Sequence, residues 1–388
     1  MKFPKYIIAA LAAPLLAACS SDDLGPSIFP DVSDEPDPNS FTYKFDKWLN
    51  VNFRDIYNVD FKYLMEDVEA DMEYNLVPAT YENARDLALL TKYLWYDSYK
   101  ELAGEDFIKS YGPRILHLVG SPAYNPNSGT ETLGLAEGGL KVTLFKVNEM
   151  DLEDINMLNE YYFRTMHHEF GHILHQTKSY PTDFNLLSTG RYDDSSWQSK
   201  QPGYVASLGF ITPYASSQAR EDFAETIANY LTRTPEQMEL ILWMSKQGWT
   251  NGSDNEDVDL DDEDTNYFCY YFYDDPSDLD SKHYFFYSEE KTFGNCQMGM
   301  VGLNGEYLTS VEEVEAYLEK LRETREIFPV EDKDKVNGYE VIMQKQSIAR
   351  NWFTDQWKIS FDDLRNIVQR RQKDFDIIAL RNEVNSIQ

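Results

Sequence analysis

The feature that most constrains this chain is a cluster of histidines at helical spacing near its middle. Four of the six histidines in the sequence, His167, His168, His172 and His175, fall within nine residues. Residues i and i+4 lie on the same face of an α-helix, one turn apart. A helix through this cluster therefore brings the imidazoles of His168 and His172 together, where both can bind one metal ion.

Residues 168–172 read His-Glu-Phe-Gly-His, the H-E-x-x-H signature of zinc hydrolases. The helix that carries them is predicted from Asp151 to about Lys178. The carboxylate of Glu169 points toward a water in the open coordination position of the metal, which suits a general base. The sequence thus predicts one catalytic Zn²⁺ and a nearby base.

A catalytic zinc site has three protein ligands, so a further residue is needed. One straight helix cannot easily wrap three imidazoles around one ion, and we therefore expect His175 to contact a ligand or to pack nearby. Glu221 and Glu225 lie one turn apart in the next predicted helix, in the stretch Glu-Asp-Phe-Ala-Glu. Because the phase of that helix relative to the metal is undetermined, either carboxylate could be the third ligand.

The remaining pattern predicts a mostly helical α+β fold with a small sheet. Apolar residues recur at helical spacing from residue 43 to about 109, and residues 115–119 and 140–147 are predicted strands. Residues 120–139 are rich in Gly, Ser, Pro and Asn and are predicted as a loop. The strand at 140–147 lies immediately before the H-E-x-x-H helix, where zincin peptidases have an edge strand, and this resemblance implies an edge strand able to hold an extended peptide by main-chain hydrogen bonds.

The block 251–300 differs in composition from the rest of the domain. It begins with a run of carboxylates at residues 254–264, predicted to be solvated, and continues with an aromatic stretch. We interpret it as an inserted acidic and aromatic subdomain within a domain at 41–388. Cys269 and Cys296 lie in this block, and either a disulfide or two buried thiols fits the sequence.

The N-terminus has the pattern of a processed targeting segment. An apolar run that is too short to span a membrane ends in Leu-Ala-Ala-Cys19, which resembles the bacterial lipobox. Residues 1–18 are predicted as the signal peptide, and Cys19 as the lipid-bearing residue that attaches the protein to a bilayer. A plain secretory signal is the alternative. Residues 19–40 form a predicted disordered tether, with the folded part starting near Phe41.

The formal net charge of −32 excludes one class of partner. A negative field of this size repels phosphate backbones, so nucleic acid is not an expected partner. The hydrophobic content of 42% is enough for a sizeable core.

The assembly of these motifs resembles the zinc-binding metallopeptidase lipoproteins of Bacteroidetes, described as substrate-import-associated zinc metallohydrolases. The residues that carry the resemblance are the lipobox with its Ser-Ser-Asp-Asp tail, residues 167–176 and residues 221–225. The resemblance implies a zincin-like, gluzincin-type domain. It also implies attachment to the outer membrane, at either face, beside a TonB-dependent importer and its surface lipoprotein.

The site is further similar to that of the anthrax lethal-factor type of metallopeptidase. In gluzincins the first acid of a pair four residues apart binds zinc, and the second supports a ligand histidine. The lethal-factor type also has a tyrosine seven residues before the ligand glutamate, a position occupied here by Tyr214. The resemblance thus implies Glu221 as the third ligand, Glu225 as the support and Tyr214 as the hydroxyl that stabilises the oxyanion; Glu225 as ligand stays the alternative.

These features predict a zinc-dependent hydrolase, most readily a peptidase acting on a peptide or protein. The competing interpretation is a catalytically silent, zinc-containing binding or scaffold subunit of an import complex. A pure binder would have no need for Glu169 beside the ligands, and this favours the enzyme.

Overall fold

A computed structural model describes residues 35–65, 76–124, 131–132, 134–137, 141–251, 267–291, 297–333 and 335–388. The predicted signal peptide, Cys19, most of the tether, the acidic run at 254–264 and Cys296 lie outside the described residues. The first helix begins at Tyr43, two residues after the predicted start of the folded part. Within the described ranges, no helix has both the length and the apolar character needed to cross a bilayer.

Helices make up most of the described chain, which confirms the prediction of a mostly helical α+β fold. The α-helices are α2 (Tyr43–Leu49), α3 (Asp55–Tyr57), α4 (Tyr81–Leu90), α5 (Asp97–Ala103), α6 (Glu105–Tyr111), α7 (Ile155–Leu158), α8 (Arg164–Thr177), α9 (Asp183–Leu186), α10 (Pro202–Ser207), α11 (Ala219–Thr232), α12 (Pro235–Met244), α13 (Val311–Arg322), α14 (Gly338–Trp352), α15 (Phe361–Asp374) and α16 (Ile377–Asn385). Wider π-helical turns are η1 (Asn50–Arg54), η2 (Thr91–Tyr96), η4 (Asn159–Phe163) and η8 (Phe353–Trp357), and 3-10 turns are η3 (Val147–Glu149), η5 (Trp197–Ser199), η6 (Tyr214–Ser216) and η7 (Leu279–Ser281).

The largest sheet has the strand order β1-β2-β6-β5, formed by β1 (Asp60–Lys62), β2 (Ile115–Leu118), β6 (Lys141–Leu144) and β5 (Gly134–Glu137). The first three strands are parallel and β5 is antiparallel to β6. The expectation that the strand at 140–147 is an edge strand is wrong, because β6 is paired on both sides. The antiparallel edge is β5, inside the segment predicted as a loop, and its outer main-chain groups are the ones an extended peptide could pair with.

A separate antiparallel pair is formed by β3 (Ala123–Tyr124) and β4 (Glu131–Thr132). The remaining strands follow α12 in the chain and form small antiparallel sheets. They are β7 (Thr250–Asn251), β8 (Tyr267–Phe268), β9 (Tyr270–Tyr273), β10 (Lys282–Phe285), β11 (Tyr287–Glu290), β12 (Met298–Val301), β13 (Tyr307–Leu308) and β14 (Phe328–Pro329). Their orders are β10-β9-β14, β11-β12-β13 and β7-β8.

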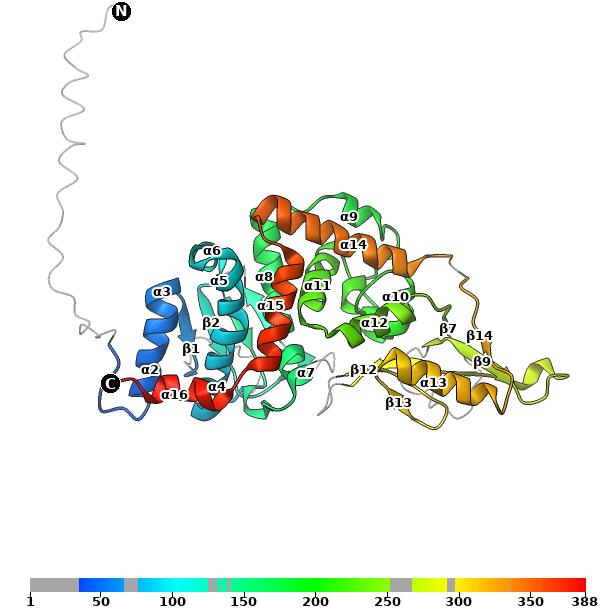
Figure 1. Cartoon of the computed structure of the whole chain (residues 1–388), viewed down its shortest axis with the longest axis horizontal. Helices are drawn as coiled ribbons and strands as arrows, with labels where there is room; N and C mark the ends of the chain where they lie inside the picture. Colours follow the sequence, from blue (N-terminus) through cyan, green and yellow to red (C-terminus); the bar gives the residue numbers. More distant parts are fainter. Residues whose placement is uncertain are drawn as a thin grey trace, which may run out of the picture.

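The molecule is elongated and buries two main hydrophobic clusters (Figure 1). The larger cluster joins α2 to α8 with α11 and the C-terminal helices, around aromatic side chains such as Trp48, Trp95 and Phe170. The second cluster lies under the small sheets at the other end, where strands of the 267–301 segment pack with residues from α10, α12 and α13. The strands of the predicted insert therefore share a core with chain segments on both sides of them.

The helix that carries the histidines is continuous from Ile155 to Thr177 through α7, η4 and α8. It starts four residues later than the predicted Asp151, because Asp154 is its cap: Oδ1 of Asp154 accepts hydrogen bonds from the backbone N–H groups of Asn156 and Met157. In η4 the N–H of Arg164 bonds to the carbonyl of Asn159, five residues back, so this turn is one residue wider than an α-helical turn.

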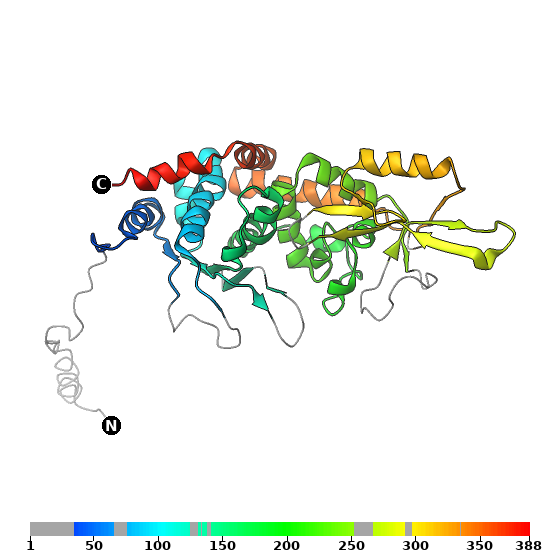
Figure 2. The ribbon, with the colours of Figure 1, turned by 90° about the horizontal axis from the view of Figure 1, so that it is seen from below.

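The ends of the described chain meet. Helix α15 is followed by α16, which packs against α2 and α4 (Figure 2). The ammonium groups of Lys44 and Lys47 donate to the backbone carbonyls of Asn385 and Gln388 at 2.8 and 3.0 Å. The C-terminal segment thus completes the part of the fold that contains the first helix.

Candidate metal centre

The centre is built on two helices, α8 and α11, that pack closely against each other. Gly171 on α8 faces Ala224 on α11, and a Cβ placed on Gly171 would lie 3.5 Å from the Cα of Ala224. Phe170 and Ile227 are buried beside this contact. Because small residues let the two backbones approach, polar side chains one turn away on each helix can reach each other.

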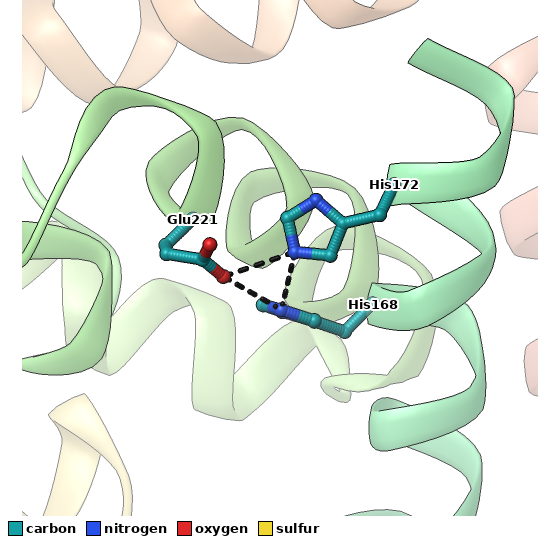
Figure 3. Close-up of side chains that lie close together, drawn as sticks. All are labelled: His168, His172 and Glu221. Atoms are coloured by element: carbon teal, nitrogen blue, oxygen red, sulfur yellow. Dashed lines mark hydrogen bonds and ion pairs between the residues drawn. The ribbon is translucent and has the colours of Figure 1, made fainter. Parts of the chain in front are cut away.

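Three potential ligand atoms converge between these helices (Figure 3). Nε2 of His168 lies 3.0 Å from Nε2 of His172, and Oε2 of Glu221 lies 3.1 and 2.9 Å from these two nitrogens. Around a tetrahedral zinc ion with ligand distances of about 2.0–2.2 Å, neighbouring ligand atoms are about 3.3–3.6 Å apart. The set of two imidazoles and one carboxylate, at nearly this spacing, fits a zinc ion.

Glu225 does not point at this convergence. Its Oε1 lies 2.7 Å from Nδ1 of His168, on the opposite side of the imidazole ring from the three ligand atoms. Its Oε2 accepts hydrogen bonds from the Thr212 hydroxyl at 2.6 Å and from the Asn229 amide at 3.1 Å. The structure therefore separates the two carboxylates that the sequence left as alternatives: Glu221 faces the ligand atoms, and Glu225 faces the back of His168.

This arrangement fixes the protonation of His168. Burial disfavours ionisation of Glu225, but hydrogen bonds from His168 and Thr212 outweigh it and lower the pKa of Glu225 to about 2. An ionised carboxylate only accepts hydrogen bonds, so Nδ1 of His168 carries the proton and, in the neutral ring, Nε2 keeps its lone pair. That lone pair points at two other electron-rich atoms, an arrangement that calls for a cation between them.

The charges of the cluster favour the same conclusion. Burial opposes a positive charge on His168, yet its hydrogen bonds to Glu221 and Glu225 outweigh burial and raise the pKa of His168 to about 10. The same contacts hold the pKa of Glu221 well below its ordinary value, against the effect of burial. Without a metal, the two carboxylates bind a proton at His168; a zinc ion would replace that proton.

His175 and His167 do not reach the three ligand atoms. Nε2 of His175 lies 2.9 Å from Nδ1 of His172, so His175 contacts a ligand candidate from behind. His167 is fully buried on another face of α8, where Nδ1 lies 2.9 Å from the hydroxyl of Tyr99. Burial lowers the pKa of His167 to about 3, so this ring is neutral and belongs to the core.

Glu169 follows the first ligand candidate and is half-buried. Burial raises the pKa of Glu169 above its ordinary value, although the neighbouring His168 and His172 act in the opposite direction. A carboxylate whose pKa is shifted toward neutrality both accepts and returns a proton readily at neutral pH.

Tyr214 lies at the open side of the cluster, in the short turn η6. Its ring is 5.8 Å from the ring of His168, centroid to centroid, and 4.8 Å from that of Trp197, and the residue is 37% exposed. Burial of the rest of the phenol, together with the charge of Glu221, raises the pKa of Tyr214 above its ordinary value. The hydroxyl is therefore protonated at neutral pH and can donate a hydrogen bond.

Two further contributors to the site, Thr212 and Asn229, are absent from the predicted set. Asn229 lies four residues after Glu225 on α11, so the same helical spacing that linked Glu221 to Glu225 could have identified it. Thr212 precedes η6 in a long irregular connection, and no local pattern marks it as a partner of Glu225.

Comparison with known proteins gives one family and one solved structure. The family described as "Putative zinc-binding metallo-peptidase" matches residues 39–264. A similar solved structure is the crystal structure of a protein from Bacteroides caccae ATCC 43185, described in the same words as the family, "putative zinc-binding metallo-peptidase". The two sequences are 31% identical, the match covers 90% of this chain and 98% of that one, and the TM-score is 0.57. No curated protein matches the sequence.

Proposed function

The chain belongs to this family of zinc-binding metallo-peptidases, and from that membership we propose that it is a zinc-dependent peptidase with one catalytic ion held by His168, His172 and Glu221. The observation that carries the proposal is the convergence of Nε2, Nε2 and Oε2 of these residues within 3.1 Å of one another. Glu169, which a purely structural zinc site does not need, lies directly beside them.

Zinc, when bound there, lowers the pKa of a water molecule to about 7 and polarises the scissile carbonyl. Glu169 accepts the proton of the attacking water and delivers it to the leaving amine. The neutral phenol of Tyr214 donates a hydrogen bond to the oxygen that becomes negative as the tetrahedral carbon forms. Glu225 keeps His168 in the tautomer whose Nε2 lone pair faces the ligand cluster.

The proposal is tested in two steps. Elemental analysis of protein purified with zinc is expected to give about one ion per chain, and substitution His172→Ala is expected to remove it. Absence of zinc from the wild type would refute the whole assignment.

The second step compares the wild type with Glu169→Gln on a peptide library. Cleavage by the wild type, reduced by about 10²-fold or more in a variant that still holds zinc, supports a peptidase. Zinc binding without cleavage by either protein would favour the binding or scaffold subunit instead.

We further propose that the protein is a lipoprotein of the outer membrane, anchored through an acylated Cys19 and associated with a TonB-dependent importer and its surface lipoprotein. The support is the Leu-Ala-Ala-Cys sequence and its resemblance to the lipobox. In cells fed a labelled fatty acid, the wild type should take up label and sediment with membranes, whereas Cys19→Ala should do neither. Protease treatment of intact cells would then report which face of the membrane carries the domain.

A further inference from the structure

The oxygen of Glu225 that faces away from His168 is the first member of a hydrogen-bonded chain that ends on strand β11. The Asn229 amide nitrogen donates to Oε2 of Glu225 at 3.1 Å, and Nε of Arg233 donates to Oδ1 of Asn229 at 2.8 Å. Nη2 of Arg233 then donates to Oε1 of Glu290 at 2.7 Å. Four side chains thus connect the back of the metal centre to a strand of the small sheets.

The donors and acceptors in this chain can be assigned without choice. A guanidinium group has only donors, so Arg233 requires the Asn229 side chain to present its oxygen. The amide nitrogen of Asn229 must then face Glu225, where it donates. Oε2 of Glu225 accepts this bond, which leaves Oε1 facing Nδ1 of His168 at 2.7 Å. Fixing Arg233 therefore fixes the orientation of the carboxylate that contacts Nδ1 of His168.

Three of the four side chains in this chain are buried, and the side chain of the fourth, Glu290, is 17% exposed. Asn229 is 0% and Arg233 1% exposed, and Glu225 is 8% exposed. Glu290 is also held by Arg164, whose Nη1 lies 3.4 Å from Oε1 of Glu290 and 2.6 Å from Oε2 of Glu160. In such surroundings a guanidinium group that loses its carboxylate partner moves or takes up another acceptor, because an unpaired buried charge is costly.

We propose that Glu290 is a positioning residue for the metal centre: it anchors Arg233, which orients Asn229 and Glu225 and so keeps the lone pair of His168 directed at the ion. The inference rests on the zinc site proposed above. Glu290 lies on β11, outside the residues 39–264 that the family matches, so the small sheets contribute to a centre otherwise built from α8 and α11. The packing of these small sheets against α8 and α11 therefore contributes to the zinc affinity of the centre.

The test measures zinc affinity of the full chain by competition with a chromophoric chelator. Glu290→Gln removes the charge that anchors Arg233 and is expected to weaken zinc binding about 10-fold, in the range seen for outer partners of ligand histidines. Glu289→Gln is the matched control, because it makes the same change one residue away, where the side chain points to the other face of the strand. This control should leave the affinity unchanged.

A double-mutant cycle separates positioning from a general loss of structure. If Glu290 acts through Glu225, then Glu290→Gln should change zinc affinity by less than about 2-fold in a Glu225→Gln background. Equal losses in both backgrounds, or no loss in the wild-type background, would overturn the proposal. A wild type without zinc would instead refute the metal site itself, so the two failures are distinguishable.

The cycle has a second form for the case in which Glu290→Gln does not fold. Asn229→Ala breaks the same chain of contacts one link from Glu225 and removes no charge. It should weaken zinc binding in the wild type but have little effect beside Glu225→Gln. If Asn229→Ala weakens zinc binding equally in the wild type and in the Glu225→Gln variant, the proposal is overturned, as in the first cycle.

Discussion

Nδ1 of His172 lies 2.9 Å from Nε2 of His175, on the side of the His172 ring that faces away from the other ligand candidates. Burial, with the neighbouring His172, lowers the pKa of His175 to about 4, so at neutral pH its ring is uncharged and Nε2 can accept a hydrogen bond. We expect His175→Ala to keep one zinc per chain and to weaken its binding about 10-fold. Elemental analysis and chelator competition measure the two quantities. A complete loss of zinc, as expected for His172→Ala, would make His175 a ligand.

Tyr214→Phe removes one hydroxyl from the open side of the centre. If this hydroxyl stabilises the oxyanion, kcat should fall about 10²–10³-fold while KM and zinc content stay close to those of the wild type. Steady-state kinetics on a cleaved peptide would show the division between kcat and KM. A variant with unchanged kcat would leave the oxyanion to the metal alone.

Lys345→Met breaks a buried ion pair beside the centre. Nζ of Lys345 lies 2.6 Å from Oδ2 of Asp222, and both side chains are at most 2% exposed. The substitution removes the cation that balances the buried Asp222, whose remaining partner is the Tyr192 hydroxyl at 2.9 Å, and we expect it to lower the free energy of unfolding by about 3–5 kcal/mol. Lys100→Met, which breaks the exposed pair with Glu105, is the control and should cost less than about 1 kcal/mol. Denaturant unfolding measures both, and equal values would contradict the argument.

Among the residues that the structure describes, Cys269 has no disulfide partner; its thiol is buried, and Sγ lies 3.1 Å from the carbonyl oxygen of Phe286. Because only the thiolate reacts with disulfide reagents, Cys269 should be unreactive in the native protein and should be labelled on unfolding without a reductant. Mass spectrometry of the labelled peptides would identify it. If Cys269 and Cys296 formed a disulfide, neither would be labelled without reduction.

The buried thiol of Cys269 makes the free energy of unfolding depend on pH. Burial raises the pKa of Cys269 well above its ordinary value, whereas in the unfolded chain it is about 8.5. A group whose pKa is raised on folding gives its full stabilisation below the unfolded pKa and loses it as pH rises above that value. Stability should therefore fall above about pH 8.5, by up to about 1.4 kcal/mol per pH unit. Unfolding curves of Cys269→Ala should lack this contribution.

The elements with a strong local pattern could be predicted from the sequence. The helix that carries the histidines lies where the spacing of residues predicts it, and the local sequence pattern of Thr234 and Gln237 matches the capping box found at the start of α12. The short strands β1 and β5 could not be predicted: β5 lies in a segment whose Gly, Ser, Pro and Asn content indicates a loop, and β1 is paired with a distant strand. For β1 that partner is β2, more than fifty residues later, and helical periodicity on both sides of β1 obscures it.

The candidate metal centre likewise contains parts that the sequence could predict and parts that it could not. The spacing of His168, Glu169 and His172 is a local property, and one helix is enough to bring the two imidazoles together. The separation of Glu221 from Glu225 depends on how α11 is rotated against α8, which follows from contacts such as Gly171 with Ala224. Glu290 carries no local signal, because its significance depends on Arg233 and Arg164 from other elements.

In the helix that carries the histidines, the wide turn η4 makes the number of residues before His168 matter as well as their identity. Each residue added to or removed from an α-helix turns everything after it by about 100°. Five residues of π-helix at Asn159–Phe163 therefore set the rotational phase at which His168 and His172 emerge. Because this turn holds one residue more than an α-helical turn, deleting one residue there would let it close to a regular turn with the histidines still facing Glu221. A deletion between Arg164 and His167, in regular α-helix, would instead turn the histidines away from Glu221.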